Sequence, residues 1–144
     1  MGDDRKGLLT QLEVSAKRLC SIFRTVNSFE HFYNSPDTHE LCLYHLGIIC
    51  ETVIALARDV LVRLGLPVSN LDLSTLISTL AKNNIIKPDF VRPLQELMSM
   101  RDNLLHPYLG LDFQKVFYFL KEHADKFNDL AKEFEKFSGR QNEV

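Results

Sequence analysis

An arginine, a histidine and a tyrosine lie close together in the stretch RDNLLHPY, residues 101–108. Arg101 offers a permanently charged guanidinium fork that fits a phosphate group. His106 titrates near neutral pH, so it can accept or deliver a proton. These two groups suit cleavage of an RNA phosphodiester, because the 2′-hydroxyl supplies the nucleophile and a base and a cation beside the phosphate make a metal unnecessary.

The same residues also have a purely structural interpretation. An arginine near a helix C-terminus is favoured by the helix dipole, and a histidine at a C-cap can bond the last carbonyl groups. A tyrosine after a proline is an ordinary turn residue. From the residue types alone, both interpretations stay open.

The spacing within the stretch predicts a helix end. In a continuous helix, side chains five residues apart point about 140° away from each other, so Arg101 and His106 would not meet. Pro107 disfavours the helical conformation of the residue before it, and the helix is therefore expected to end near His106. Beyond this end, His106 and Tyr108 can turn back toward the guanidinium, within one chain or across a two-fold axis.

Apolar residues at three- and four-residue steps predict helices along most of the chain. The fold class expected is all-α, an up-and-down bundle of four main helices plus a short accessory helix. It forms one domain over residues 1–144, with a polar tail that frays from about 138. The main helices are predicted at about 4–30, 38–64, 88–106 and 112–137, and the short helix from a cap at Ser69 or Asn70 to about Lys82.

The second of these helices is apolar on most of its sides, which indicates a bundle core or a subunit interface and favours a homodimer. His45 within it is interpreted as a core or interface histidine. The phenylalanines of the last helix follow helical spacing and are predicted to be core residues. Tyr44 and Tyr118 are interpreted in the same way.

Composition excludes several classes of protein. A net charge of −2 argues against a protein that coats nucleic acid, so no DNA partner is expected. The three cysteines have no CxxC spacing, and neither a metal site nor a cofactor is predicted. The apolar segment in MGDDRKGLL is too short for a secretory signal, and no uninterrupted apolar run suits a membrane helix. The expected location is cytoplasmic, away from the membrane.

RDNLLHPY resembles the R-x4-H-x-Y motif of the HEPN superfamily, and specifically of the HepT-like toxins of HEPN/MNT toxin–antitoxin modules. The similarity extends over roughly residues 5 to 137. It includes Glu51 in the apolar run IICETVIALARDVL, the stop formed by Gly65 and Pro67, and Asp112 at the end of HPYLGLD.

The resemblance implies a helical homodimer in which Arg101 and His106 of both chains line an interface cleft and act as a metal-independent endoribonuclease on RNA. It implies that Asp102 orients or tunes these residues. Glu51 could pair with Arg101 or orient it, although a lone glutamate on a bundle helix is more often solvated or salt-bridged for structure. The resemblance also implies an MNT-type nucleotidyltransferase antitoxin as partner. In some members this partner attaches AMP to the tyrosine of the motif, here Tyr108, and so blocks the cleft with negative charge. The sequence leaves open whether the partner inhibits by this modification or by occlusion. The alternative is a non-catalytic HEPN helical module that binds a nucleotidyltransferase or a nucleotide.

Overall fold

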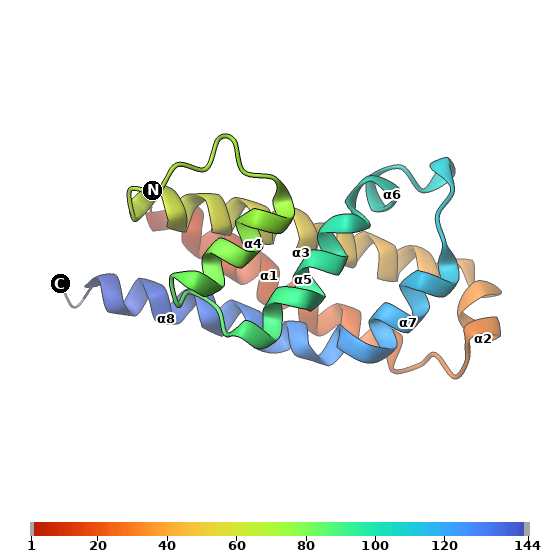
Figure 1. Ribbon diagram of the computed structural model, residues 1–144. Helices are drawn as coiled ribbons and strands as arrows, with labels where there is room; N and C mark the ends of the chain where they lie inside the picture. Colours follow the sequence, from red (N-terminus) through yellow and green to blue (C-terminus); the bar gives the residue numbers. More distant parts are fainter. Residues whose placement is uncertain (1, 143–144) are drawn as a thin grey trace.

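The computed structural model describes the backbone of residues 2–142 and the side chains of residues 4–137. All regular secondary structure in this part of the chain is helical, with no strand, which confirms the predicted fold class (Figure 1). The elements are α1 (Gly2–Phe23), α2 (Phe29–Tyr33), α3 (Pro36–Arg63), α4 (Leu73–Lys82), η1 (Pro88–Phe90), α5 (Val91–Ser99), α6 (Arg101–Leu105), η2 (Pro107–Leu109), α7 (Phe113–His123), η3 (Ala124–Asp129) and α8 (Leu130–Asn142).

The long helices α1 and α3 form the centre of the bundle. They pack along each other, and η3 and α8 pack against α1. In Figure 1 the segment from α7 to α8 runs along one side of the bundle, and α4 and α5 cover another. Large side chains from all of these elements are fully buried, which gives the bundle one continuous apolar core: Leu12, Leu19, Leu46, Ile49, Leu56, Leu61, Ile77, Leu80, Phe127 and Phe134.

Helix α3 begins and ends close to where the sequence predicts. Pro36 occupies its first turn, and Gly65 follows its end with a φ of +77°, a left-handed conformation that glycine adopts without strain. By length and composition α3 could cross a membrane, yet 61% of its most apolar window is buried in the bundle. Core helices of soluble proteins pass the same test, so this property is weak evidence for a membrane span.

Two of the predicted long helices are interrupted. The helix expected to reach residue 30 ends at Phe23, because the Ser28 hydroxyl accepts a hydrogen bond from the His31 amide at 3.1 Å and starts α2 as a separate helix. The C-terminal helix, capped by Asp112 as predicted, passes through the 3₁₀ segment η3. The cap of α4 is Asp72 and not Ser69 or Asn70, since its carboxylate accepts from the Thr75 amide at 2.7 Å.

The helix predicted over 88–106 is also broken, at Met100, which ends α5 and begins α6. Arg101 is therefore the first residue of a short helix and does not lie in the last turn of a long one. Figure 1 shows α6 projecting from the bundle beside α3. The break places the motif on a protruding element at one end of the molecule. At the chain's end α8 continues to Asn142, and the rest of the tail expected to fray lies outside the described residues.

The tyrosines differ from the prediction. Tyr44 is 63% exposed and Tyr118 is 55% exposed, so neither is a core residue. The phenylalanine prediction is confirmed for Phe117, Phe127 and Phe134, which are buried. His45 is buried as expected, and this burial lowers the pKa of its imidazole, with a smaller effect of the same sign from Arg18.

Candidate active site

The motif is displayed by a short helix that proline terminates. His106 is the C-cap of α6, with φ of −133°, and Pro107 opens the 3₁₀ turn η2. The Leu109 amide donates to the His106 carbonyl at 3.0 Å, which closes this turn. Gly110 follows with a φ of +100°, a conformation that strains any residue with a Cβ. These local features fix the direction in which His106 and Tyr108 leave the helix, as the sequence predicts for Pro107.

Arg101 is held by a residue fifty positions away in the sequence. Its Nε donates to Glu51 Oε1 at 2.6 Å and its Nη2 to Glu51 Oε2 at 3.1 Å, a bidentate pair between α6 and α3. The hydrogen bonds that Arg101 donates to the Glu51 carboxylate raise the pKa of Arg101. The side chains of Arg101 and Glu51 remain 35% and 41% exposed, so the pair adds little stability and mainly fixes the orientation of the guanidinium.

His106 and Tyr108 form a second pair. The Tyr108 hydroxyl lies 3.2 Å from His106 Nδ1, and the two rings meet edge to face with centroids 5.7 Å apart. Both side chains are exposed, Tyr108 by 79%. If the tyrosine hydroxyl donates to Nδ1, the imidazole carries its proton on Nε2, and the reverse tautomer leaves Nε2 as a free base. The pair thus couples the tautomer of His106 to Tyr108.

The structure brings the predicted site residues together as two pairs and not as one cluster. Within the described part of a single chain, no hydrogen bond joins Arg101 to His106 or Tyr108. The Asp102 side chain is exposed and bonds to none of these groups, although its backbone carbonyl accepts from the His106 amide at 2.9 Å. Of the two arrangements that the sequence left open, the one within a single chain is therefore not held by a hydrogen bond to the guanidinium.

Cys50, next to Glu51 in α3, does not compete as a nucleophile. Its thiol is buried, and desolvation raises its pKa to about 12, so it stays protonated at neutral pH.

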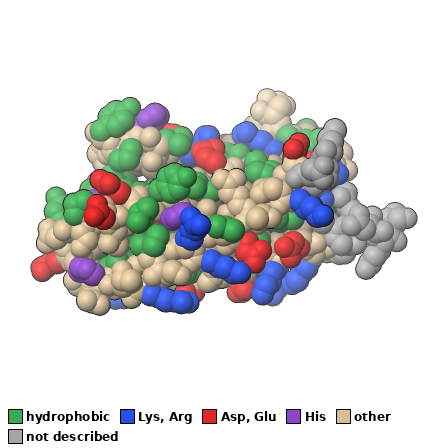
Figure 2. All heavy atoms as spheres, turned by 180° about the vertical axis from the view of Figure 1, so that it is seen from behind, with side chains coloured by type: hydrophobic (Ala, Val, Ile, Leu, Met, Phe, Trp, Pro, Cys, Tyr) green, Lys and Arg blue, Asp and Glu red, His purple; other side chains and the backbone are tan. Residues whose placement is uncertain are grey.

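An open groove of about 600 Å³ lies against the site, between α1, α3 and the α6–η2 element. Figure 2 shows this face from behind, with hydrophobic side chains gathered around a hollow below a projecting lobe. Glu51 lines the groove, and so do residues that the sequence did not single out as functional, namely Leu8, Gln11, Glu40, Leu43, Tyr44, Gly47, Ile48, Thr52, Leu104, Leu105 and Pro107.

One residue in the sequence, Gly47, could have indicated this groove. Gly47 lies in the middle of α3, where glycine costs about 1 kcal/mol relative to alanine. A Cβ at this position would contact nothing within 4 Å in the chain, so internal packing does not require the glycine. Its effect is to leave the floor of the groove open.

The chain is a helical bundle that displays an R-x4-H-x-Y motif, and a glutamate holds the arginine of this motif. These features define the class of HEPN-type proteins. The model of the family described as "Ribonuclease HepT-like" matches residues 12–134, and the chain belongs to this family. No curated protein matches the chain by sequence.

Among solved structures, the chain is similar to YutE from Bacillus subtilis, a cytosolic protein of unknown function. The TM-score is 0.77 at 14% sequence identity, covering 96% of this chain and 92% of the YutE chain. At this identity the likeness shows a shared fold.

Proposed function

We propose that the protein is a metal-independent endoribonuclease and the toxin of a toxin–antitoxin module. The observation that carries this proposal is the exposed His106–Tyr108 pair beside the Glu51-held Arg101, in a chain of a ribonuclease family. The site combines a base with a fixed cation on a protruding element that a single RNA strand can reach.

The cleavage step uses groups that the site presents. The neutral imidazole of His106 takes the proton of the RNA 2′-hydroxyl, and the 2′-oxygen attacks the adjacent phosphorus. The guanidinium of Arg101 neutralises the charge that develops on the phosphoryl oxygens. The bond from phosphorus to the 5′-oxygen breaks, and that oxygen takes a proton from a protonated His106 of the second chain. The products are a 2′,3′-cyclic phosphate and a 5′-hydroxyl.

The site is completed by a second copy of the chain, seated in the groove. Exposed apolar side chains lie along it, with Tyr44 63% and Leu105 47% exposed. Gly47 keeps room there for a side chain that this chain does not supply. In such a dimer the two motif elements lie on either side of one cleft, which accounts for the separation of Arg101 from His106 within one chain.

The test uses purified protein and one RNA in two forms, in EDTA. The unmodified single strand should be cut to products with cyclic phosphate ends. The same strand with 2′-O-methyl riboses should stay intact, because it lacks the nucleophile. Cleavage of both forms would contradict the transesterification mechanism, and cleavage only after added Mg²⁺ would contradict metal independence.

The proposed antitoxin is a minimal nucleotidyltransferase that transfers AMP to Tyr108. The Tyr108 oxygen attacks the α-phosphorus of ATP, pyrophosphate leaves, and the hydroxyl proton is released. Tyr108 is 79% exposed and bonds only to His106 within the described chain, so a transferase can reach its hydroxyl. The product would place a phosphate directly beside His106 and exclude the RNA phosphate.

Co-expression with a nucleotidyltransferase encoded beside this gene should add the mass of one AMP per chain and silence RNA cleavage. A Tyr108→Phe chain should gain no mass under the same conditions, while Tyr33→Phe, at another exposed tyrosine, should be modified normally. Equal modification of the Tyr108→Phe chain would place the acceptor elsewhere. In this proposal the protein acts in the cytoplasm, where its RNA substrates and this partner occur.

A further inference from the structure

The exposed face of α7 carries a tyrosine between two lysines. We propose that this face and the pocket beside it bind single-stranded RNA next to the cleaved bond, by stacking bases on aromatic rings and pairing phosphates with the lysines. This inference rests on the proposed ribonuclease function and adds a substrate-binding surface to it.

Lys115, Tyr118 and Lys121 are all exposed and follow one another at three-residue steps along α7. Residues three apart are neighbours on a helix surface, so the tyrosine ring has a cation on either side. Phe117 and Phe119 next to it are 6% and 3% exposed, whereas Tyr118 is 55% exposed. Phe117 and Phe119 therefore pack in the core, whereas Tyr118 is exposed to solvent.

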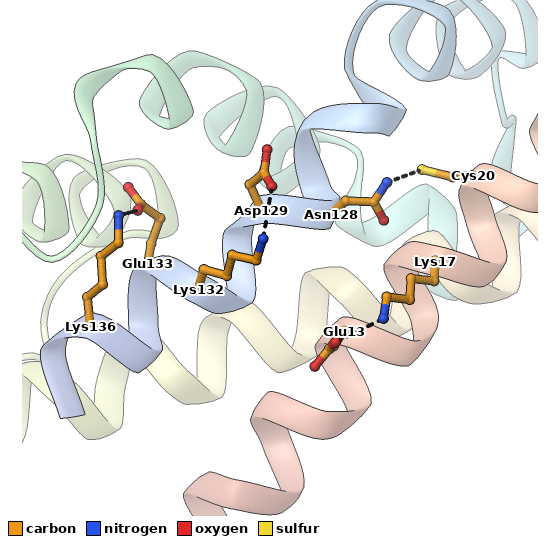
Figure 3. Close-up of polar contacts among 8 residues, drawn as sticks. All are labelled: Glu13, Lys17, Cys20, Asn128, Asp129, Lys132, Glu133 and Lys136. Atoms are coloured by element: carbon orange, nitrogen blue, oxygen red, sulfur yellow. Dashed lines mark hydrogen bonds and ion pairs between the residues drawn. The ribbon is translucent and has the colours of Figure 1, made fainter. Parts of the chain in front are cut away.

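The two lysines of this face differ from several others in lacking a carboxylate partner. Figure 3 shows three lysines of α1 and α8 in ion pairs: Lys17 with Glu13 at 3.0 Å, Lys132 with Asp129 at 3.9 Å and Lys136 with Glu133 at 3.3 Å. Within the described side chains, neither Lys115 nor Lys121 has such a pair. Their ammonium groups are available to an external anion such as a phosphate.

A pocket of about 330 Å³ adjoins this face. The volume lies at the lower end of the range of about 300–1,000 Å³ for small-ligand sites. Half of its lining residues are aromatic, and Lys121 and Asn27 also line it. Unpaired bases stack on aromatic rings and bond to amide groups through their edges, so this lining suits a nucleobase. The remaining lining residues are Phe23, Val26, Ser28, Phe29, Phe117 and Tyr118.

The aromatic surface continues toward the motif. Tyr33 of α2 is 53% exposed, and its ring packs edge to face on Phe113, the first residue of α7, with centroids 5.4 Å apart. Figure 1 shows α2 and the start of α7 at the end of the bundle from which α6 projects. On the other side Tyr33 packs against Phe29 with ring centroids 5.9 Å apart. Phe29 in turn contacts Phe117, the neighbour of Tyr118, with ring centroids also 5.9 Å apart. An RNA strand leaving the motif can therefore continue along α7.

The chemistry of this face favours RNA over a protein partner. The cores of protein interfaces are depleted of lysine and are apolar, whereas single-strand binding sites combine aromatic rings with cations. On the exposed face of α7 the aromatic Tyr118 lies between two cations, Lys115 and Lys121, which matches a single-strand binding site.

The chain has no tryptophan, so Tyr118→Trp creates a single fluorescent reporter on this face. In a His106→Ala background that cannot cut, a single-stranded oligouridylate or oligoadenylate of about 12 nucleotides should quench this tryptophan. The matched control is Val62→Trp in the same background, because Val62 is 58% exposed on α3. Its emission should not change.

Affinity gives a second readout. In the same background, Tyr118→Ala should weaken binding of the oligonucleotide by roughly 5- to 150-fold, the factor expected for one stacked base, and Tyr118→Phe should retain it. Lys121→Gln should reduce the slope of log affinity against log salt by about 0.7, the value for one single-strand phosphate, while Lys132→Gln leaves it unchanged.

The two proposals can fail separately. In one case the wild type cuts RNA, but the Tyr118→Trp reporter is not quenched and Tyr118→Ala binds RNA normally. This result would overturn the proposed RNA-binding surface on α7 and leave the proposed ribonuclease function standing. If the reporter is quenched but the wild type cuts nothing, the surface is supported and the ribonuclease function is contradicted. Quenching by a nucleotidyltransferase and not by RNA would overturn the inference in favour of a protein-docking surface.

Discussion

Arg101→Ala is expected to lower kcat/KM for RNA cleavage by about 10²–10³-fold with the fold unchanged. The guanidinium neutralises charge that develops on the phosphate, and its loss removes an interaction that is strongest in the transition state. The bidentate bond to Glu51, at 2.6 Å and 3.1 Å, fixes this group, so Arg101→Lys should restore little of the rate, since an ammonium cannot reproduce the fork.

The matched control for this prediction is Arg58→Ala. Arg58 is exposed on α3, the helix that also carries Glu51, and lies outside the motif. Initial rates on a fluorescent RNA, with thermal melting of each variant, measure the effect. Wild-type rates in a folded Arg101→Ala protein would remove Arg101 from the catalytic machinery.

Tyr44→Asp is expected to dissociate the proposed dimer and abolish most cleavage at low protein concentration. Tyr44 lines the groove that the second chain would cover, and burying an unpaired carboxylate there costs several kcal/mol, enough to weaken a dimer by more than about 100-fold. Because the side chain is 63% exposed in the single chain, the fold of each monomer should survive.

Val62→Asp is the matched control, since Val62 is a similarly exposed apolar residue of α3 outside the groove. Sedimentation equilibrium should give a monomer for Tyr44→Asp and a dimer for the wild type and Val62→Asp. A Tyr44→Asp protein that remains dimeric would show that the second chain, if present, does not occupy this groove.

The parts of the fold that local sequence determines could be predicted. Gly65 and Pro67 set the end of α3, the Asp112 carboxylate caps α7 by accepting from the Lys115 amide at 3.1 Å, and Pro107 ends α6. Each of these residues acts on its immediate neighbours, through a backbone conformation or a single hydrogen bond. Their effects are therefore readable from a few letters of sequence.

The break at Met100 could not be predicted in this way. The segment MSMRDN contains no glycine or proline, and the apolar spacing continues across it from Leu97 to Leu104. The N-cap position is Met100, which makes no side-chain capping bond, so no cap residue marks the start of α6. Tertiary packing decides the break, because both Met100 and Leu104 are buried where α6 meets α3. The exposure of Tyr44 and Tyr118 depends in the same way on which neighbours cover each helix.

The same distinction between local and long-range determinants applies to the candidate site. The types and spacing of Arg101, His106 and Tyr108 indicated the chemistry, and the bond between His106 and Tyr108 joins residues two apart. The pairing of Arg101 with Glu51 spans fifty positions, so periodicity alone could not establish it. The groove is formed by three segments distant in sequence and was not predicted, although Gly47 in the middle of α3 could have pointed to it.

The central claim is that His106 of this chain cleaves RNA without a metal. The most direct measurement is RNA cleavage in EDTA by wild type and His106→Ala, both purified without a partner and both checked by intact mass for AMP on Tyr108. We predict that the wild type cuts and that His106→Ala is slower by about 10²–10⁴-fold. Equal cleavage by the two proteins would contradict the role of His106, and no cleavage by an unmodified wild type would contradict the claim and favour a non-catalytic binding module.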